Sequence, residues 1–255
     1  MADIENINGL NKNEDKVIDK NNNKGIEENK TNESENKSEN KNKIFSLVLA
    51  AGESSRMGTP KQLLTYGGIS FLTRAIEGFI RSGVDDIVVV CGYMFERMED
   101  HILNSNYSIS KKELMERLII VENAGYKSGQ LSSIKAGLNA FTRKKAVDFY
   151  RGFMIQLIDR PLVRYDTFIK LKETFVSGIQ PILIPSYQMK RGHPACFSSE
   201  FIGRITALGE NASLKDILSS YESGINYLTV DDAGITANID TPLEYEKIKG
   251  VVHVD

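Results

Sequence analysis

The sequence predicts an α/β fold, with a mostly parallel central sheet flanked by helices on both faces. Two observations lead to this prediction. From residue 44 onward, short apolar runs alternate with segments of helical periodicity, which is the pattern of strands joined by crossover helices. The runs are apolar at nearly every position, as in strands that are buried on both faces of a parallel sheet.

The expected strands are short and rich in β-branched residues. The first is the run IFSLVLA from Ile44, and the second is the run DIVVVC from Asp86. Further strands are expected at 118–122, 153–158, 181–185, 195–197 and 225–230. The segment 187–193 is rich in turn formers and should connect two of them.

The expected helices lie between these strands. Residues 69–82 carry apolar side chains at the spacing of one helix face, and Gly83 should end this helix. Ser213 and Thr241 are suited to cap two later helices, and Pro242 suits a first helical position. The other expected helices cover 93–103, 130–141, 166–176, 213–221 and 242–249, while 104–112 is polar enough to form a loop.

Residues 1–43 differ from the rest of the chain. Asn, Lys, Glu, Asp and Ser dominate this stretch, which contains no aromatic residue and no Arg. Such a segment cannot bury enough apolar surface to offset about 1–2 kcal/mol of backbone ordering entropy per residue. We therefore expect a disordered low-complexity tail at 1–43, followed by one domain at 44–255.

Composition excludes several classes of partner. The chain has 32 Lys and Arg against 34 Asp and Glu, so it lacks the basic footprint of a nucleic-acid-binding protein. No apolar run approaches the roughly 20 residues that cross a bilayer, so no membrane partner is expected. Cys91 and Cys196 stand far apart without a Cys-x-x-Cys spacing, and the three histidines complete no zinc pattern with them. These features predict a soluble cytoplasmic protein.

The stretch after the first strand has the composition of an anion-binding loop. Residues 52–61 hold two glycines, two serines, Arg56 and Lys61, so backbone N–H groups and two cations can converge on one point. The planar guanidinium of Arg56 can donate two parallel hydrogen bonds, and the ammonium of Lys61 provides a compact positive charge. The spacing is neither that of a Walker A motif nor that of the dinucleotide fingerprint. An ordinary strand-to-helix loop is the alternative interpretation.

The ordered string L-A-A-G-x-S-x-R-M-G-x-P-K-x-L-L, which begins at Leu49, resembles the signature loop of the molybdenum cofactor cytidylyltransferase family. This resemblance implies a Rossmann-like nucleotidyltransferase fold with a MobA-like NTP transferase domain, in which this loop wraps a nucleoside triphosphate. The A-A-G form is similar to the cytidine-using branch, whereas guanosine-using relatives usually read A-G-G. The nucleotide-binding residues implied in this loop are Leu49, Ala50, Ala51, Gly52, Ser54, Ser55, Arg56, Gly58 and Lys61.

Asp159 follows the strand expected at 153–158, at the carboxyl edge where open α/β sheets bind ligands. Its surroundings, LIDRPLV, resemble the family's G-D-Q-P-L-V segment, whose Asp is a magnesium ligand. Two positions depart from that pattern, because Ile158 replaces the usual Gly and Arg160 the usual Gln. Arg160 could pair with a phosphate, or it could weaken the metal site. A helix cap or turn residue is the alternative interpretation of Asp159.

The run NIDTPLEY resembles the family's late D-x-D-T-P-x-D-Y motif, which implies that Asp240 is the second metal-binding carboxylate. Alternatively, Asp240 merely precedes the capping Thr241. The run NAGYKSGQLSS from Asn123 matches a third family segment, and by this resemblance Gly129 and Ser132 approach the base and ribose. N–H groups at a helix start suit an anion, although a capping role for Ser132 is the alternative.

The run KRGHPA resembles the R-G-x-P segment that lines the acceptor pocket in the cytidylyltransferase branch. By this resemblance Arg191, Gly192 and His193 bind the acceptor. A binding role suits His193 better than a general-base role, because a phosphate acceptor is already ionised.

Together the motifs predict a Mg²⁺-dependent enzyme that joins CMP from CTP to the phosphate of molybdopterin or its molybdenum-loaded form, with release of pyrophosphate. Arg56 and Lys61 would neutralise the triphosphate, while Asp159 and Asp240 hold the metal. One alternative is a related enzyme that uses GTP, or that acts on a sugar or polyol phosphate. Another is a catalytically silent nucleotide-binding factor that hands cofactor to a molybdoenzyme client.

Overall fold

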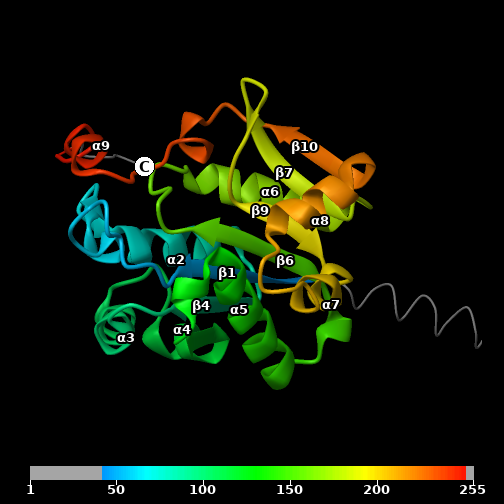
Figure 1. Ribbon diagram of the computed structural model, residues 1–255, viewed down its shortest axis with the longest axis horizontal. Coiled ribbons are helices and arrows are strands. Elements are labelled where there is room, and N and C mark those ends of the chain that lie inside the picture. The colour runs from blue at the N-terminus through cyan, green and yellow to red at the C-terminus, as the bar shows by residue number, and fades with distance from the viewer. Residues whose placement is uncertain (1–41, 251–255) are drawn as a thin grey trace, which may run out of the picture. The chain divides into compact units, whose positions relative to one another are not determined.

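The computed structural model describes residues 42–250 of the 255-residue chain (Figure 1). The tail predicted at 1–43 lies outside the described residues except for its last two positions, as do residues 251–255 at the end of the predicted domain.

A mostly parallel sheet organises this part of the chain, as the sequence predicts. Its strands run in the order β10-β7-β9-β6-β1-β4-β5, and β8 pairs with β7. All neighbours pair in parallel except β9, which is antiparallel to β6 and β7, and β8, which is antiparallel to β7. The strands are β1 (Lys43–Ala50), β4 (Asp86–Cys91), β5 (Leu118–Glu122), β6 (Tyr150–Leu157), β7 (Ile182–Tyr187), β8 (Lys190–Arg191), β9 (Ala195–Ser198) and β10 (Ile225–Thr229).

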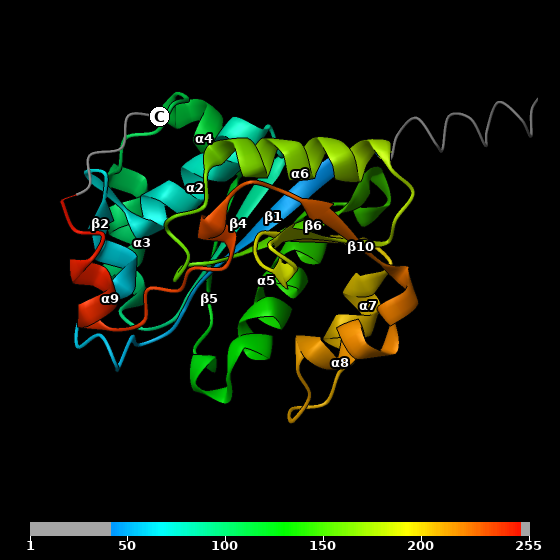
Figure 2. The same cartoon turned by 90° about the horizontal axis from the view of Figure 1, so that it is seen from above.

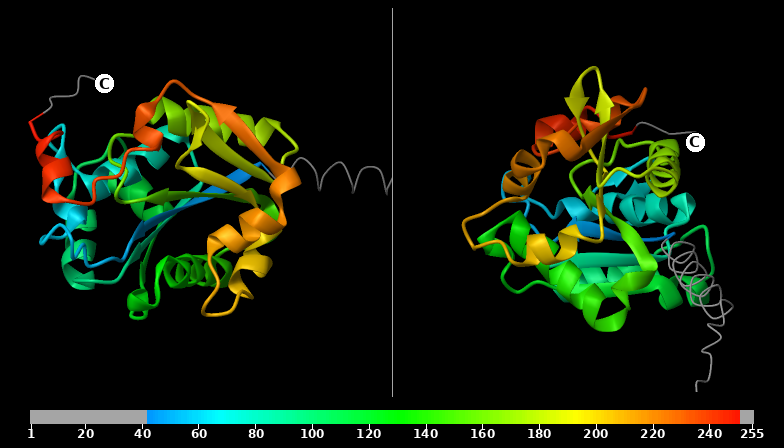
Figure 3. Two further views of the ribbon diagram at one scale, coloured as in Figure 1. Left: turned by 45° about the horizontal axis from the view of Figure 1, so that its top comes forward. Right: turned by 90° about the vertical axis from the view of Figure 1, so that its right-hand side faces the viewer.

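Helices cover both faces of the sheet (Figure 2). One face buries apolar side chains of α2 (Phe71–Ser82), α3 (Phe95–Asn104), α4 (Lys111–Arg117) and α6 (Tyr165–Ser177). The other face packs against α5 (Gln130–Lys144), α7 (Phe201–Thr206) and α8 (Leu214–Ser220), and Figure 3 shows α7 and α8 beside α5. The last helix, α9 (Pro242–Glu246), lies near a two-stranded antiparallel ladder of β2 (Thr65–Tyr66) and β3 (Ile69–Ser70).

The first strand shows how the sequence builds the two layers. Alternate side chains of β1 point to opposite faces, so Phe45 and Leu47 pack towards α5 while Ile44 and Val48 pack towards α2. All of these side chains are fully buried. The continuous apolar run therefore reflects burial on both sides, as expected for a central parallel strand.

The helix boundaries confirm most of the capping predictions. Gly83 ends α2 in the left-handed conformation with φ 68°. Ser213 and Thr241 both form capping boxes, and Pro242 is the first residue of α9.

Several predicted boundaries were wrong. The helix predicted at 69–82 begins at Phe71, because the two preceding residues form β3 and Ser70 caps the helix. The loop predicted at 104–112 ends earlier, since Ser110 caps α4 by accepting the N–H of Glu113. Helix α7 was not predicted, and α9 ends at Glu246 rather than at 249.

The described residues, 42–250, include no helix with both the length and the apolar character needed to traverse a lipid bilayer.

Candidate active site

The loop after β1 is folded by its own polar groups. Ser54 has a φ of 59°, and its carbonyl accepts hydrogen bonds from the N–H groups of Met57 (2.8 Å) and Gly58 (3.2 Å). The Ser54 hydroxyl accepts the N–H of Lys61 at 3.1 Å. Gly58 itself has a φ of 71°, which a residue with a side chain rarely adopts. The loop therefore curves back on itself between the strand and Lys61.

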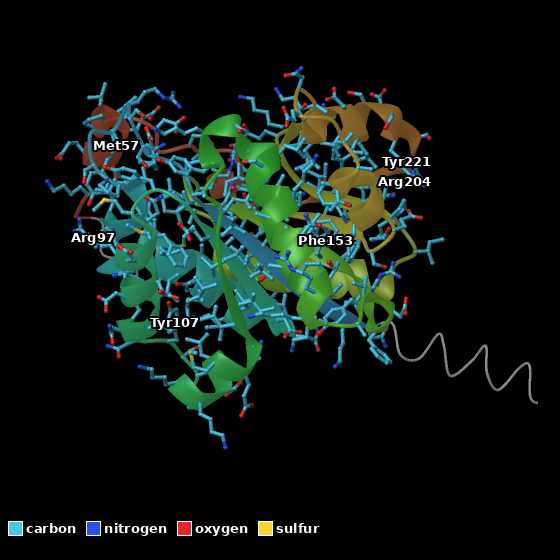
Figure 4. All side chains as sticks on the ribbon, turned by 60° about the horizontal axis from the view of Figure 1, so that its bottom comes forward. Met57, Arg97, Tyr107, Phe153, Arg204 and Tyr221 are labelled. Atoms are coloured by element: carbon cyan, nitrogen blue, oxygen red, sulfur yellow. The ribbon has the colours of Figure 1, made fainter. Side chains whose placement is uncertain are left out.

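Two buried side chains anchor this loop to the domain. Gln62, which the sequence analysis did not single out, donates through Nε2 to the carbonyls of Ala50 (2.7 Å) and Gly52 (2.9 Å). Met57 is buried, and Figure 4 places it beside α9. It belongs to a small apolar cluster with Tyr66, Phe71, Ile239 and Ile248. Because Ile239 belongs to this cluster, the loop and the segment before α9 pack as one unit.

This packing brings Asp240 against both cations of the loop. Its carboxylate accepts a hydrogen bond from the Lys61 ammonium, and 3.1 Å separates Arg56 Nη2 from Asp240 Oδ2. Burial tends to raise the pKa of Asp240, but the hydrogen bond and charge of Lys61, with the charge of Arg56, hold it below its ordinary value. The Lys61 side chain is 9% exposed and that of Arg56 is 72% exposed. Solvent and salt therefore screen the Lys61–Asp240 ion pair less than the Arg56–Asp240 ion pair.

Asp159 lies beside Asp240, because the N–H of Ile239 donates to the Asp159 carbonyl at 2.9 Å. Oδ1 of Asp159 is buried and has no hydrogen-bond partner within residues 42–250. Burial raises the pKa of the Asp159 carboxyl, and the charges of Arg160 and Lys61 partly offset this effect. An unpartnered buried carboxylate oxygen is costly unless something else pairs with it.

The two aspartates suit a hard divalent cation. Within the described part of the chain no cluster of three or more His, Cys, Asp or Glu side chains could hold a metal ion. Mg²⁺ in nucleotide sites needs only one or two carboxylates, since substrate phosphates and water complete its coordination. The unpartnered Asp159 oxygen beside the ionised Asp240 therefore fits such an ion, although Asp240 would have to share its oxygens with Lys61.

A cavity of about 400 Å³ lies at the carboxyl end of β1. Most residues that the sequence predicts to bind nucleotide line it, and Asp159 borders it as well. The predicted residues in its wall are Leu49, Ala51, Gly52, Ser54, Ser55, Arg56, Lys61, Gly129 and Asp159. Three predicted residues lie elsewhere: Ala50 is fully buried in β1, Gly58 borders a separate cavity, and Ser132 hydrogen-bonds to backbone carbonyls.

The start of α5 forms one wall of this cavity. Gly129 precedes the helix with a φ of 99°. The Ser132 hydroxyl donates to the Gly129 carbonyl at 2.8 Å, while the neighbouring Ser133 lines the cavity. Asn123 donates through Nδ2 to both hydroxyls, at 2.9 Å and 3.0 Å. The Asn and Ser positions of this motif therefore act together to order the helix start.

Tyr126 is a further wall residue that the sequence analysis did not identify. Its hydroxyl donates to Oε1 of Glu53 at 2.8 Å, which ties the helix start to the loop after β1. A Cβ atom at Gly92 would lie 2.8 Å from both the Tyr126 ring and the Ala51 carbonyl. Gly92 thus permits the close approach of these two walls. A glycine directly after the second strand was the only sequence signal for this contact.

A second cavity, of about 370 Å³, adjoins the first, and Gln130 lines both. The predicted acceptor residues Arg191, Gly192 and His193 all lie in its wall. Arg160 and Lys215 add two further cations. The remaining wall is largely apolar and contains Ile184, Ala195, Phe197, Leu214 and Leu218.

His193 is held as a neutral imidazole. Nδ1 lies 3.2 Å from the carbonyl of Ile155, a contact that requires the proton on Nδ1 and leaves Nε2 as an acceptor. Burial, together with the positive charge of Arg160, lowers the pKa of His193 to about 4. A base this weak is poorly suited to proton abstraction at neutral pH, which agrees with the predicted binding role.

Comparisons with known proteins agree with this geometry. The chain is 25% identical to the purine catabolism protein PucB of Bacillus subtilis (strain 168) over 210 residues, which cover 81% of this chain and 96% of PucB. It is 31% identical to 2-C-methyl-D-erythritol 4-phosphate cytidylyltransferase of Rhodococcus opacus (strain B4) over 102 residues, or 39% of each protein.

Solved structures share the fold. Rv0371c from Mycobacterium tuberculosis H37Rv superimposes with a TM-score of 0.64 at 22% identity, over 80% of this chain and 97% of that one. Its complex with manganese gives a TM-score of 0.62 at 21% identity, over 82% of this chain and 100% of that one.

The family model described as "MobA-like NTP transferase domain" matches residues 46–225, which include the loop, Asp159 and the second cavity. The predicted nucleotidyltransferase fold and enzyme class are thereby confirmed. The chain belongs to the family of MobA-like NTP transferases.

Proposed function

We propose that this enzyme transfers CMP from CTP to the phosphate of molybdopterin or its molybdenum-loaded form. The observation that supports this proposal best is that consecutive residues, Asp159 and Arg160, line the two adjoining cavities. A nucleoside triphosphate in the first cavity and a phosphate acceptor in the second would meet at the end of β6.

The reaction forms one bond and breaks one. An oxygen of the acceptor phosphate attacks the α-phosphorus of CTP, and the bond from that phosphorus to the β-phosphate bridging oxygen breaks, so pyrophosphate leaves with the bonding pair. Both reactants are anions, so positioning and charge neutralisation provide most of the catalysis. Lys61 and Arg56 would neutralise the triphosphate, which requires them to exchange their contact with Asp240 for phosphate oxygens.

Asp159 and Asp240 would hold Mg²⁺, which when bound neutralises charge on the phosphates that flank the reacting phosphorus. The manganese complex of Rv0371c supports a divalent cation in this fold. The Lys61 contact would keep Asp240 oriented towards the loop before the metal and nucleotide arrive.

The base assignment rests on two observations. The loop reads Ala50-Ala51-Gly52, the form that resembles the cytidine-using branch. The relative from Rhodococcus opacus is a cytidylyltransferase. We therefore propose CTP as the donor, with GTP as the alternative.

The second cavity favours an acceptor that combines a phosphate with a flat ring. Its cations suit the phosphate, and the part-buried side chains of Leu214 and Leu218 offer apolar contact to a ring system. A sugar or polyol phosphate would leave that apolar wall without a partner. PucB is described as a purine catabolism protein, and similarity over most of its length supports a role in purine catabolism, in which we propose a molybdoenzyme client. Cys91 and Cys196 are both free, which supports the cytoplasmic location proposed for the protein.

Pyrophosphate release with CTP, Mg²⁺ and molybdopterin tests the proposal. We expect turnover with CTP to exceed that with GTP, ATP and UTP, and a clear preference for GTP would overturn the base assignment. Turnover with a polyol phosphate but not with molybdopterin would overturn the acceptor assignment. Tight CTP binding without turnover on any of these acceptors would favour the silent maturation factor.

A further inference from the structure

We propose that Arg160 binds the phosphate group of the acceptor and so selects phosphate monoesters for the second cavity. This inference rests on the nucleotidyl transfer proposed above and assigns one of its specificity-determining residues. The sequence leaves open whether Arg160 binds a phosphate or weakens the metal site.

Arg160 lies where the two cavities adjoin. Asp159 borders the nucleotide cavity and Arg160 borders the acceptor cavity, so these two consecutive residues lie at the boundary between the cavities. The acceptor oxygen must reach the α-phosphorus across this boundary. Its phosphate therefore has to lie next to the Asp159 carboxylate, where two anions repel each other unless a cation stands beside them.

The hydrogen-bonding capacity of the Arg160 side chain is only partly used within residues 42–250. Nη1 donates to the carbonyl of Ile235 at 2.7 Å, which anchors one end of the guanidinium. Nε is buried and has no hydrogen-bond partner among residues 42–250. Leaving such a donor unpaired costs about 1–3 kcal/mol, so an acceptor atom from a ligand would be stabilising there.

The charge of Arg160 is not neutralised by a direct ion pair within residues 42–250. Arg160 forms no ion pair with any carboxylate of the described residues, whereas Asp240 is already paired with Arg56 and Lys61. Arg160 therefore does not neutralise the carboxylates of the metal site by direct contact. Of the cations in the acceptor cavity, Arg160 is part-buried, while Arg191 and Lys215 are exposed. A partly desolvated guanidinium that forms no ion pair with a carboxylate is suited to phosphate binding, although its charge also acts on Asp159 at longer range.

Binding of phenyl phosphate tests the inference directly, because its ring suits the apolar wall and its phosphate suits Arg160. Calorimetry on the full-length protein should show that Arg160→Gln binds phenyl phosphate at least tenfold more weakly than the wild type. Arg160→Lys should show an intermediate loss, because it keeps the charge but not the planar guanidinium. Arg164→Gln removes the same charge four residues away on an exposed side chain and should bind like the wild type. The Ile235 carbonyl also accepts the N–H of His193 at 3.1 Å, so Arg160→Gln should remain folded.

Transfer kinetics provide the second measurement. We expect Arg160→Gln to raise the KM for molybdopterin at least tenfold and to leave the Kd for CTP unchanged. Phenyl phosphate that binds equally to wild type and Arg160→Gln, or not at all to wild type, would overturn the inference. An equal loss of CTP affinity would also overturn the inference, since it would assign Arg160 to the nucleotide and metal site. If binding of phenyl phosphate depends on Arg160 but wild type transfers CMP to no acceptor, the proposed function fails, while phosphate binding by Arg160 stands.

Discussion

His193 should make the stability of this protein depend on pH in a way that one substitution removes. Its pKa lies near 6.5 in an unfolded chain and at about 4 in the folded one. Between these two pH values the unfolded chain binds more protons than the folded chain. The contribution of His193 to the free energy of unfolding is therefore complete above pH 6.5 and is lost as the pH falls towards 4. At pH 5 the two pKa values correspond to a loss of about 2 kcal/mol relative to pH 7.5.

Urea unfolding at pH 7.5 and pH 5 measures this loss. Other groups also titrate in this range, so the informative quantity is the difference between wild type and His193→Gln. A glutamine can still donate to the Ile155 carbonyl but does not titrate, so the variant should lose about 2 kcal/mol less than wild type. His101→Gln is the control, and its free energy of unfolding should fall between pH 7.5 and pH 5 by most of the wild-type amount. Equal losses in wild type and His193→Gln would refute the assigned environment of His193.

Three further variants test the site and the core. Asp159→Asn should lower kcat/KM with CTP by roughly 10²-fold or more, as for a lost metal ligand worth several kcal/mol, and unchanged pyrophosphate release would remove Asp159 from the chemistry. Gly92→Ala should weaken CTP binding in calorimetry, because the added Cβ would lie 2.8 Å from the Tyr126 ring; Gly209→Ala, with open space around it, should not. Phe153→Ala removes a fully buried ring and should lower the free energy of unfolding by about 3–5 kcal/mol, whereas Phe149→Ala, 48% exposed, should change it little.

The candidate site was predictable to the extent that its residues lie in ordered motifs. The loop after the first strand, Asp159 and the segment around His193 all border the two cavities. Gln62 and Tyr126 were not predicted, because an isolated Gln or Tyr has no spacing signal. Their roles depend on contacts with Ala50 and Glu53 that only the folded chain supplies.

The sequence by itself determined most of the local structure, although it did not predict β3, α4 or α7. Apolar runs, glycines and capping residues specify strands and helix ends because these depend on neighbours a few residues away. Only the tertiary structure decided that Lys61 meets Asp240, 179 positions later, that β9 enters the sheet antiparallel to β6, and that Arg160 faces the acceptor cavity. Such contacts depend on how the crossover connections and the layers pack, and the spacing of residues within a short segment does not predict that packing.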